Sequence, residues 1–211
     1  MNRLPILLLG AGGHARACID VIEQEGRYTV AGLVGLPGER GTRILGYPVL
    51  GTDADLEALL RDYTHALITI GQIKTAEPRM RLFDLLLRNG GTPPAAIVSP
   101  HAYVSSHATL GAGSIVMHGA VVNAAAVVGR NCIINSQSLI EHDAVIADHC
   151  HIATGVAINS GVRIGSATFI GSNSSVRQMV SIGERCLIGM GQRVLADCAP
   201  GTHMPPLKGP T

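Results

Sequence analysis

Aromatic and charged residues are scarce in this chain. Its 211 residues include no tryptophan, two phenylalanines and four tyrosines, and only 15% are charged, with a formal net charge of +1. A chain this close to neutrality has no basic surface for nucleic acid or an anionic membrane, so we expect neither as a partner. Hydrophobic residues make up 46% of the chain, which suffices for a packed core. Because few of them are aromatic, we expect a narrow, repetitive interior.

Long apolar runs and paired cysteines are also missing. The apolar stretch "LPILLLG" near the start is too short to span a membrane and is followed by no cleavage pattern of small residues. We therefore expect a cytoplasmic protein. The five cysteines are odd in number, scattered and without a C-x-x-C pair, which argues against a disulfide framework and against a thiolate zinc site. We interpret them as small buried residues.

The strongest signal is a period of six residues. From Val104, every sixth residue through Val194 is Val, Ile or Leu, sixteen positions without an insertion. The position four residues after each of these is usually small, and it holds Cys132, Cys150 and Cys186. This period matches neither a helix of 3.6 residues per turn nor an alternating strand. It is typical of a solenoid of short parallel strands with three hexads per coil, here about five coils over about 24 Å.

The residues before the repeats alternate between predicted strands and helices. "LPILLLGAGGHARACIDVIEQEG" reads as a buried strand, a glycine-rich turn and an amphipathic helix. A strand, a helix, a strand and a helix follow in "TVAGLVG", "DADLEALLRD", "HALITIG" and "AEPRMRLFDLLLRNG". The sequence therefore predicts a small Rossmann-like α/β domain over residues 1–95, a parallel β-helix over 96–198 and a carboxy-terminal tail over 199–211.

The first predicted turn has the pattern of a phosphate-binding loop. Gly10, Gly12 and Ala15 match G-x-G-x-x-G/A, a turn that lets a ligand's phosphates approach the backbone at a helix amino terminus. The acidic residue that would hold a ribose at the end of the second strand is missing, because Gly35 stands there. We expect a site for a mononucleotide or a nucleotide sugar. The alternative is a tight turn needed only for packing.

Several motifs together carry a resemblance to a known family. "GAGGHAR", "IINSQSLIEHD", "HCHIATG" and the hexads resemble the hexapeptide-repeat sugar O- and N-acyltransferases, a group that includes sialic acid O-acetyltransferases and N-acetyltransferases of nucleotide-linked 4-amino sugars. The resemblance covers residues 4 to about 195. It implies a left-handed β-helix, a homotrimer with active sites between subunits, acetyl-CoA as acyl donor and no metal. A purely architectural or ice-binding β-helix would show a regular outward column, such as repeated Thr, and none is present.

The resemblance also implies the catalytic residues. His142 falls on the histidine that serves as general base, and Asp143 on the acid that would orient it, whereas Glu141 is the less suitable partner. The chemistry agrees, because a neutral imidazole can accept the proton that an attacking amine or hydroxyl loses. A neighbouring carboxylate fixes the imidazole tautomer and stabilises the imidazolium that forms. A histidine merely packed at a coil corner is the alternative interpretation.

Further positions are implied for the two substrates. His151 falls on a second histidine that would hydrogen-bond the thioester carbonyl, and a backbone N–H near Ser160 or Gly161 would serve as oxyanion donor. Coenzyme A would run beside the later coils near Ser172 and Met190.

Other residues are expected near the sugar and the nucleotide. Gly12, Gly13 and His14 would line the nucleotide pocket, and Asn135 would lie near the sugar unless it is only a corner residue. His149 matches no role in the family and is expected to be a solvated surface histidine. The ending "APGTHMPPLKGPT" departs from the family pattern, which affects the adenine end of the coenzyme site.

A zinc site is the main alternative use of the histidines. The γ-class carbonic anhydrases are β-helix proteins that bind zinc through three histidines at a trimer interface, two of them five residues apart. No two histidines have that separation among His101, His107, His118, His142, His149 and His151. His149 and His151 could share a strand face, but two ligands do not close a zinc site.

Taken together, these features predict a homotrimeric, metal-independent acetyl-CoA-dependent N-acetyltransferase acting on a nucleotide-linked 4-amino sugar for surface glycan synthesis. Direct transfer is expected, because no Cys or Ser has a base placed as its partner. The alternatives are an O-acetyltransferase of sialic acid or a related sugar, a carbonic anhydrase, and a sugar-nucleotide-binding module without catalysis, which the unusual tail permits.

Overall fold

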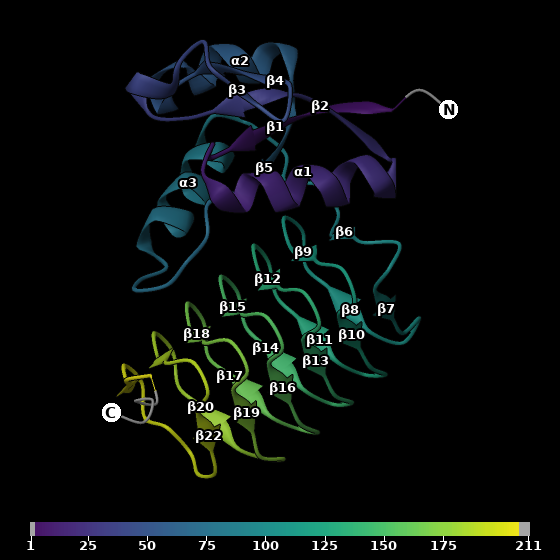
Figure 1. Cartoon of the computed structure of the whole chain (residues 1–211), viewed down its shortest axis with the longest axis vertical. Helices are drawn as coiled ribbons and strands as arrows, with labels where there is room; N and C mark the ends of the chain where they lie inside the picture. Colours follow the sequence, from purple (N-terminus) through teal and green to yellow (C-terminus); the bar gives the residue numbers. More distant parts are fainter. Residues whose placement is uncertain (1–2, 207–211) are drawn as a thin grey trace.

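The computed structural model describes residues 3–206, which form an α/β domain above a stack of coils (Figure 1). The sheet of the α/β domain has the order β3-β4-β2-β1-β5. Its strands are β1 (Leu4–Leu9), β2 (Tyr28–Val34), β3 (Arg43–Ile44), β4 (Tyr47–Gly51) and β5 (His65–Ile68). β1 pairs in parallel with β2 and with β5, as the alternating strand and helix patterns predict. The antiparallel β3–β4 hairpin at the edge was not predicted.

Three helices cover this sheet. They are α1 (Gly13–Glu25), α2 (Leu56–Asp62) and α3 (Glu77–Arg88), with short 3-10 turns η1 (Pro37–Glu39) and η2 (Asp53–Asp55). α1 ends at Gly26, whose φ of 80° is the left-handed conformation that favours glycine at a helix carboxyl end. α2 and α3 bury Leu56, Leu82 and Leu86 against one sheet face, while α1 lies between the other face and the coils (Figure 1).

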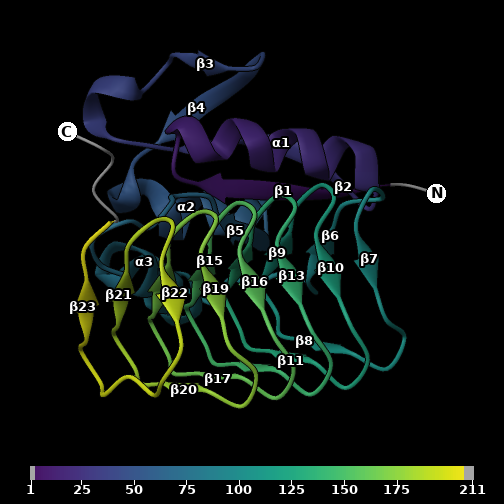
Figure 2. The ribbon, with the colours of Figure 1, turned by 60° about the horizontal axis from the view of Figure 1, so that its bottom comes forward.

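Residues 97–204 form a left-handed parallel β-helix of two-residue strands. Each coil contributes one strand to each of three sheets, which form the faces of a prism (Figure 2). The first sheet consists of β7 (Tyr103–Val104), β10 (Val121–Val122), β13 (Leu139–Ile140), β16 (Ala157–Ile158), β19 (Ser175–Val176) and β22 (Arg193–Val194). The second consists of β8 (Thr109–Leu110), β11 (Val127–Val128), β14 (Val145–Ile146), β17 (Arg163–Ile164) and β20 (Ser181–Ile182). The third consists of β6 (Ile97–Val98), β9 (Ile115–Val116), β12 (Ile133–Ile134), β15 (His151–Ile152), β18 (Phe169–Ile170), β21 (Leu187–Ile188) and β23 (His203–Met204).

The hexad pattern dictates the interior of the prism. In the register between β10 and β13, Val121 pairs with Leu139, eighteen residues further along, so that like positions stack. The second residue of most strands points inward and is buried, and the small column behind it contains Cys132 and Cys150, both fully buried. Each buried aliphatic side chain stabilises the fold by about 1.5–3 kcal/mol. All five cysteines are unpaired and buried, as predicted.

The α/β domain and the first coils share one hydrophobic cluster. Ile6 and Leu8 of β1 and the buried face of α1 pack with Ile115 and Ile133 of the β-helix. The tail does not leave the solenoid where the hexads stop, because β23 pairs with β21. Among residues 3–206 no helix is long and apolar enough to cross a membrane.

Candidate active site

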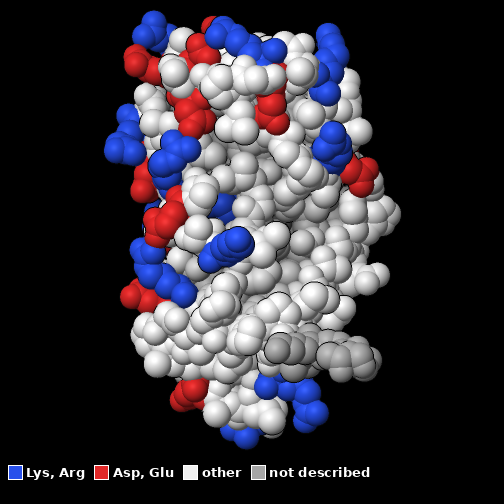
Figure 3. Space-filling view, turned by 60° about the vertical axis from the view of Figure 1, so that its left-hand side comes forward, with Lys and Arg blue, Asp and Glu red and all other residues white. Residues whose placement is uncertain are grey.

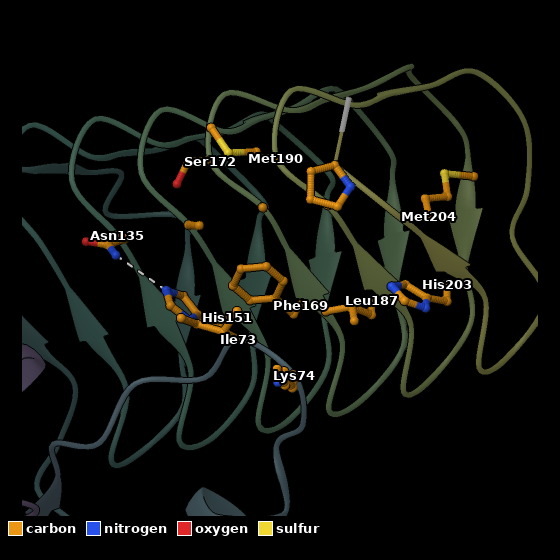
Figure 4. A pocket seen from close by; sticks show the side chains of 14 residues that line it. Ile73, Lys74, Asn135, His151, Phe169, Ser172, Leu187, Met190, His203 and Met204 are labelled. Atoms are coloured by element: carbon orange, nitrogen blue, oxygen red, sulfur yellow. Dashed lines mark hydrogen bonds between the residues drawn. The ribbon is translucent and has the colours of Figure 1, made fainter. Parts of the chain in front are cut away.

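A cavity of about 470 Å³ lies on the third sheet, beside the loop that follows β5 (Figure 4). Phe169, Leu187 and Met204 give it apolar walls, and Asn135 and His151 place polar atoms at one end. Mostly apolar cavities with a few convergent polar groups are the usual form of small-molecule sites. Asn135 and His151 line this cavity, as do two residues predicted to lie along the coenzyme, Ser172 and Met190.

The protonation of His151 follows from its surroundings. The imidazole is buried, and its Nδ1 lies 2.8 Å from the carbonyl oxygen of Gln72, which can only accept a hydrogen bond. Nδ1 therefore carries the proton. Nε2 lies 3.3 Å from Asn135 Nδ2 and accepts (Figure 4). Burial above all, with the positive charge of Arg79, lowers the pKa of His151 to about 3.

The tautomer of His151 does not permit the role that the resemblance implies for this residue. A neutral His151 whose Nδ1–H is bonded to Gln72 has only an acceptor, Nε2, to offer to the cavity. It cannot donate a hydrogen bond to a thioester carbonyl. The amide of Asn135 has a second N–H, so Asn135 is the better donor at this end of the cavity.

His14 lies in the interface between the two domains and not in a nucleotide cavity. Its ring centroid is 6.4 Å from that of His151, and its Nε2 is buried without a hydrogen-bond partner in the described part of the chain. Burial, together with Arg79, lowers the pKa of His14 to about 4. The interface therefore contains two histidines that are neutral at physiological pH.

His142 lies at a different edge of the prism, in the turn after β13, where it is exposed. Its Nδ1 is 2.7 Å from Asp143 Oδ2, and its Nε2 is 2.8 Å from Ser160 Oγ. Asp143 has a φ of 60°, a left-handed conformation that Asp tolerates better than most residues and that occurs at this turn. Glu141 accepts hydrogen bonds from Asn123 Nδ2 and from the backbone N–H of His142.

The three side chains form a directed chain of hydrogen bonds. Because the carboxylate of Asp143 accepts from Nδ1–H, Nε2 of His142 accepts from the hydroxyl of Ser160. The expectation that no serine has a base as its partner is therefore wrong. The two residues are eighteen positions apart, which is one full coil, so the hexad period itself brings Ser160 under His142.

The oxyanion donor expected near Ser160 is limited by the coil's own hydrogen bonds. The N–H of Gly161 donates to the carbonyl oxygen of His142, at 3.1 Å, and is not available to a ligand. The N–H of Ser160 has no acceptor within residues 3–206. Of the two backbone donors considered, only Ser160 remains possible.

The cavity and His142 are separated within a single chain. His142 follows a strand of the first sheet, whereas the cavity is lined by residues on and beside the third sheet, and His142 is not among them. One chain thus carries the two parts of the predicted reaction site on different edges of the prism.

A second cavity, of about 310 Å³, opens at the carboxyl ends of β1, β2 and β5. Gly10, Gly12, Gly35 and Ile70 lie where the chain leaves these strands, and all four line it. The φ of Gly10 is 123°, and a Cβ there would lie 2.3 Å from Ile70 Cγ2, so only glycine fits.

The predicted nucleotide residues do not all meet in this second cavity. Gly12 lines it, and Gly13 is next to it in the chain with open space where a Cβ would stand. His14 is not among the lining residues.

His149 is not the solvated histidine that was expected. It is half-buried, its ring meets Phe83 of α3 edge to face at 5.4 Å, and its Nδ1 is 2.9 Å from Asn131 Nδ2. Burial lowers the pKa of His149. Docking of α3 against the coil explains the difference. Among the described residues, no group of three or more His, Cys, Asp or Glu side chains is arranged to hold a metal ion.

Residues 5–84 match the family described as the PglD N-terminal domain. The whole chain is similar to perosamine N-acetyltransferase from Caulobacter crescentus, solved as a histidine-to-asparagine variant with CoA and GDP-perosamine, at 30% identity and a TM-score of 0.87 over 94% of this chain and 92% of that one. It is also similar to the acetyltransferase domain of PglB from Neisseria gonorrhoeae in complex with acetyl coenzyme A, at 26% identity and a TM-score of 0.86 over 96% of each chain. No curated protein sequence matches the chain.

Fold, motifs and similarity together define an acyltransferase built on hexapeptide repeats. The chain belongs to the hexapeptide-repeat sugar acyltransferases and is a sugar acetyltransferase that uses acetyl-CoA as its acyl donor.

Proposed function

We propose that the protein N-acetylates the amine of a nucleotide-linked 4-amino sugar in surface glycan synthesis, with His142 as general base. The observation that carries this proposal is the hydrogen-bond chain from Asp143 through His142 to Ser160, which leaves Nε2 as a proton acceptor on an exposed edge. The similarity to an enzyme whose structure contains both CoA and GDP-perosamine supports this substrate pair.

The working unit would be a homotrimer, because one chain keeps the parts of the site apart. If three prisms pack side by side around an axis parallel to their own long axes, the His142 edge of one subunit would face the cavity of the next. On the face in Figure 3, charged side chains gather over the α/β domain, along the left border and at the lower end, while the surface between them carries few. Depletion of charge is typical of the core of a subunit interface.

The proposed chemistry is a direct transfer. The sugar amine takes the place of the Ser160 hydroxyl at His142 Nε2 and attacks the thioester carbon. Nε2 removes a proton from the nitrogen as the C–N bond forms, and Asp143 stabilises the resulting imidazolium through Nδ1–H. Collapse of the tetrahedral intermediate breaks the C–S bond, and the imidazolium returns the proton to the departing thiolate.

The large cavity would hold the acyl donor. Phe169 and Met190 provide apolar contacts for the thioester arm, and Ser172 lies beside them (Figure 4). The second N–H of Asn135 would point to the thioester oxygen, while the N–H of Ser160 of the neighbouring subunit is a further donor for the developing negative charge.

The test is the release of free thiol from acetyl-CoA. Wild type and His142→Ala are assayed with UDP-, GDP- and dTDP-linked 4-amino sugars and with free and CMP-linked sialic acid. His107→Ala is the control, because His107 is an exposed histidine on another coil. Release with one amino sugar, lost only in His142→Ala, is the expected result. Release with sialic acid alone would favour the O-acetyltransferase. If no acceptor leads to thiol release while acetyl-CoA still binds, the result would contradict the proposal and favour a binding module.

A further inference from the structure

The second cavity has no acidic residue at the end of strand β2, as the sequence already indicated. Ligands of open α/β sheets bind beyond the carboxyl ends of the strands, and an acid at the end of the second strand commonly holds the nucleoside. Residue 35, directly after β2, is glycine. It lines the cavity without a side chain to offer.

The space beside Gly35 is occupied by a carboxylate from further along the chain. A Cβ built on Gly35 would lie 2.7 Å from Glu39 Oε2, closer than real Cβ atoms approach their neighbours. Any other residue at position 35 would push this carboxylate away. The glycine therefore makes room for an acid that belongs to residue 39.

The turn η1 brings Glu39 back to this place. Its N–H donates to the carbonyl oxygen of Leu36 at 2.9 Å, and the N–H of Leu36 donates to Glu39 Oε2 at 2.7 Å. These two bonds fix the half-buried side chain against the end of β2. The other oxygen, Oε1, makes no hydrogen bond or ion pair to any residue from 3 to 206.

The charges around the cavity single out Glu39 as the free acceptor. Glu39, Asp53 and Arg81 all line it. Asp53 is already paired, since its Oδ2 is 2.9 Å from an Nη of Arg81. Glu39 is thus the lining carboxylate whose charge has no cationic partner in the described chain. A carboxylate in this state accepts two or more hydrogen bonds from a ligand.

We propose that Glu39 recognises the nucleoside part of the nucleotide-linked sugar by accepting hydrogen bonds from its ribose hydroxyls or from its base N–H groups. This inference rests on the proposed function, because it assigns the second cavity to that substrate. Gly35 and Glu39 together replace the single acid that other sheets of this kind carry at the end of β2. The ribose hydroxyls and the base N–H groups belong to one nucleoside, and modified nucleotides distinguish between these two kinds of donor.

Titration calorimetry with nucleoside diphosphates alone tests the inference without any turnover. UDP, GDP and dTDP are titrated into the full chain as wild type, Glu39→Gln and Glu57→Gln. Glu57 is the matched control, because it lies on α2, pairs with Arg61 and does not line the cavity. We expect Glu39→Gln to weaken the tightest diphosphate by about tenfold or more, as for a lost charged hydrogen bond, and Glu57→Gln to leave it unchanged.

A double substitution and two altered ligands complete the test. Gly35→Asp combined with Glu39→Ala moves the acid to the end of β2 and is expected to regain affinity over Glu39→Ala alone. If the ribose is the donor, wild type and Glu39→Gln should bind the 2′-deoxy form of the tightest ligand with equal affinity. If the base is the donor, the two proteins should instead bind a form methylated at the base N–H with equal affinity.

Equal affinity of wild type and Glu39→Gln, an equal loss in Glu57→Gln, or no binding of any diphosphate to wild type would overturn the inference. If the enzyme releases thiol but its nucleotide affinity does not depend on Glu39, only this inference is contradicted. If the affinity depends on Glu39 but the protein releases no thiol, only the proposed function is contradicted.

Discussion

Two histidines have opposite environments: His142 lies at an edge of the prism, and His151 lies at the interface between the two domains. At the edge, the imidazole is exposed and takes its orientation from Asp143, its neighbour in the chain. At the interface, the imidazole is buried and takes its orientation from the carbonyl oxygen of Gln72, 79 residues away. The exposed histidine presents Nε2 to a surface hydroxyl, whereas burial lowers the pKa of the buried one and holds it neutral. Chemistry is therefore expected at the edge, and substrate positioning at the interface.

Removal of the proposed general base is expected to have the largest effect. His142→Ala is expected to lower turnover by about 10²- to 10⁴-fold, because general-base catalysis supplies a factor of that size. Its free energy of unfolding should change by no more than about 0.5 kcal/mol, since the side chain is exposed. Initial rates of thiol release and a denaturant titration check both values. Wild-type turnover in this variant would remove His142 from the mechanism.

The opposite pattern is expected at the interface. His151→Ala leaves the Gln72 carbonyl without its donor and opens a cavity beside Phe169, whose ring packs on His151 at 5.2 Å. We expect the free energy of unfolding to fall by about 2–4 kcal/mol. Urea unfolding followed by circular dichroism measures the loss. A variant as stable as wild type would show that the domains do not depend on this contact.

The two neutral histidines of the interface predict how stability depends on pH. His14 and His151 have folded-state pKa values lowered to about 4 and about 3, below the ordinary value of 6.5. Between these limits the unfolded state binds more protons than the folded state, so stability is complete above about pH 6.5 and falls as the pH drops towards 4. Each histidine adds a slope of up to about 1.4 kcal/mol per pH unit.

Unfolding titrations at several pH values from 7 to 4.5 measure this slope. His151→Leu should reduce it by about half, because one of the two buried histidines is then gone. A slope that is the same in wild type and His151→Leu would mean that the buried histidine does not titrate on unfolding.

The smallest effect on activity is expected from Ser160→Ala, which tests whether Ser160 takes part in the chemistry at the His142 edge. If the hydroxyl only holds the place of the sugar amine at His142 Nε2, Ser160→Ala should lower kcat by less than about tenfold. Mass spectrometry of wild type after incubation with acetyl-CoA alone should find no acetylated serine. An acetyl group on Ser160, together with loss of all activity in Ser160→Ala, would replace direct transfer by an acyl-enzyme.

Much of the coil was predictable from the period of six. The period identifies Ile152 and Cys150 as inward residues, and both are fully buried. It also extends to Val98, where β6 precedes the first predicted hexad, and it stops before β23, whose Met204 falls outside the pattern. Elements without such a pattern were missed. The β3–β4 hairpin turns at Leu45, a left-handed leucine that no common turn motif announces.

Residues brought together by tertiary contact were beyond the reach of sequence patterns. Gln72 carries no signal of its own, yet its carbonyl sets the tautomer of His151. Glu39 is separated from Gly35 by a short turn whose fold decides whether its carboxylate points to the cavity or to water.

The contents of each coil, the buried cysteines and the stacking of Ser160 on His142 follow from the spacing of residues along the chain, because like positions in a solenoid of this kind recur every eighteen residues. The neutral state of His151 and His14, the half-buried position of His149 and the place of Glu39 arise from contacts made in the folded molecule. These properties depend on how the α/β domain lies against the coils, and on local turns. Such contacts join residues at irregular separations, whereas a repeat determines only contacts between its own units.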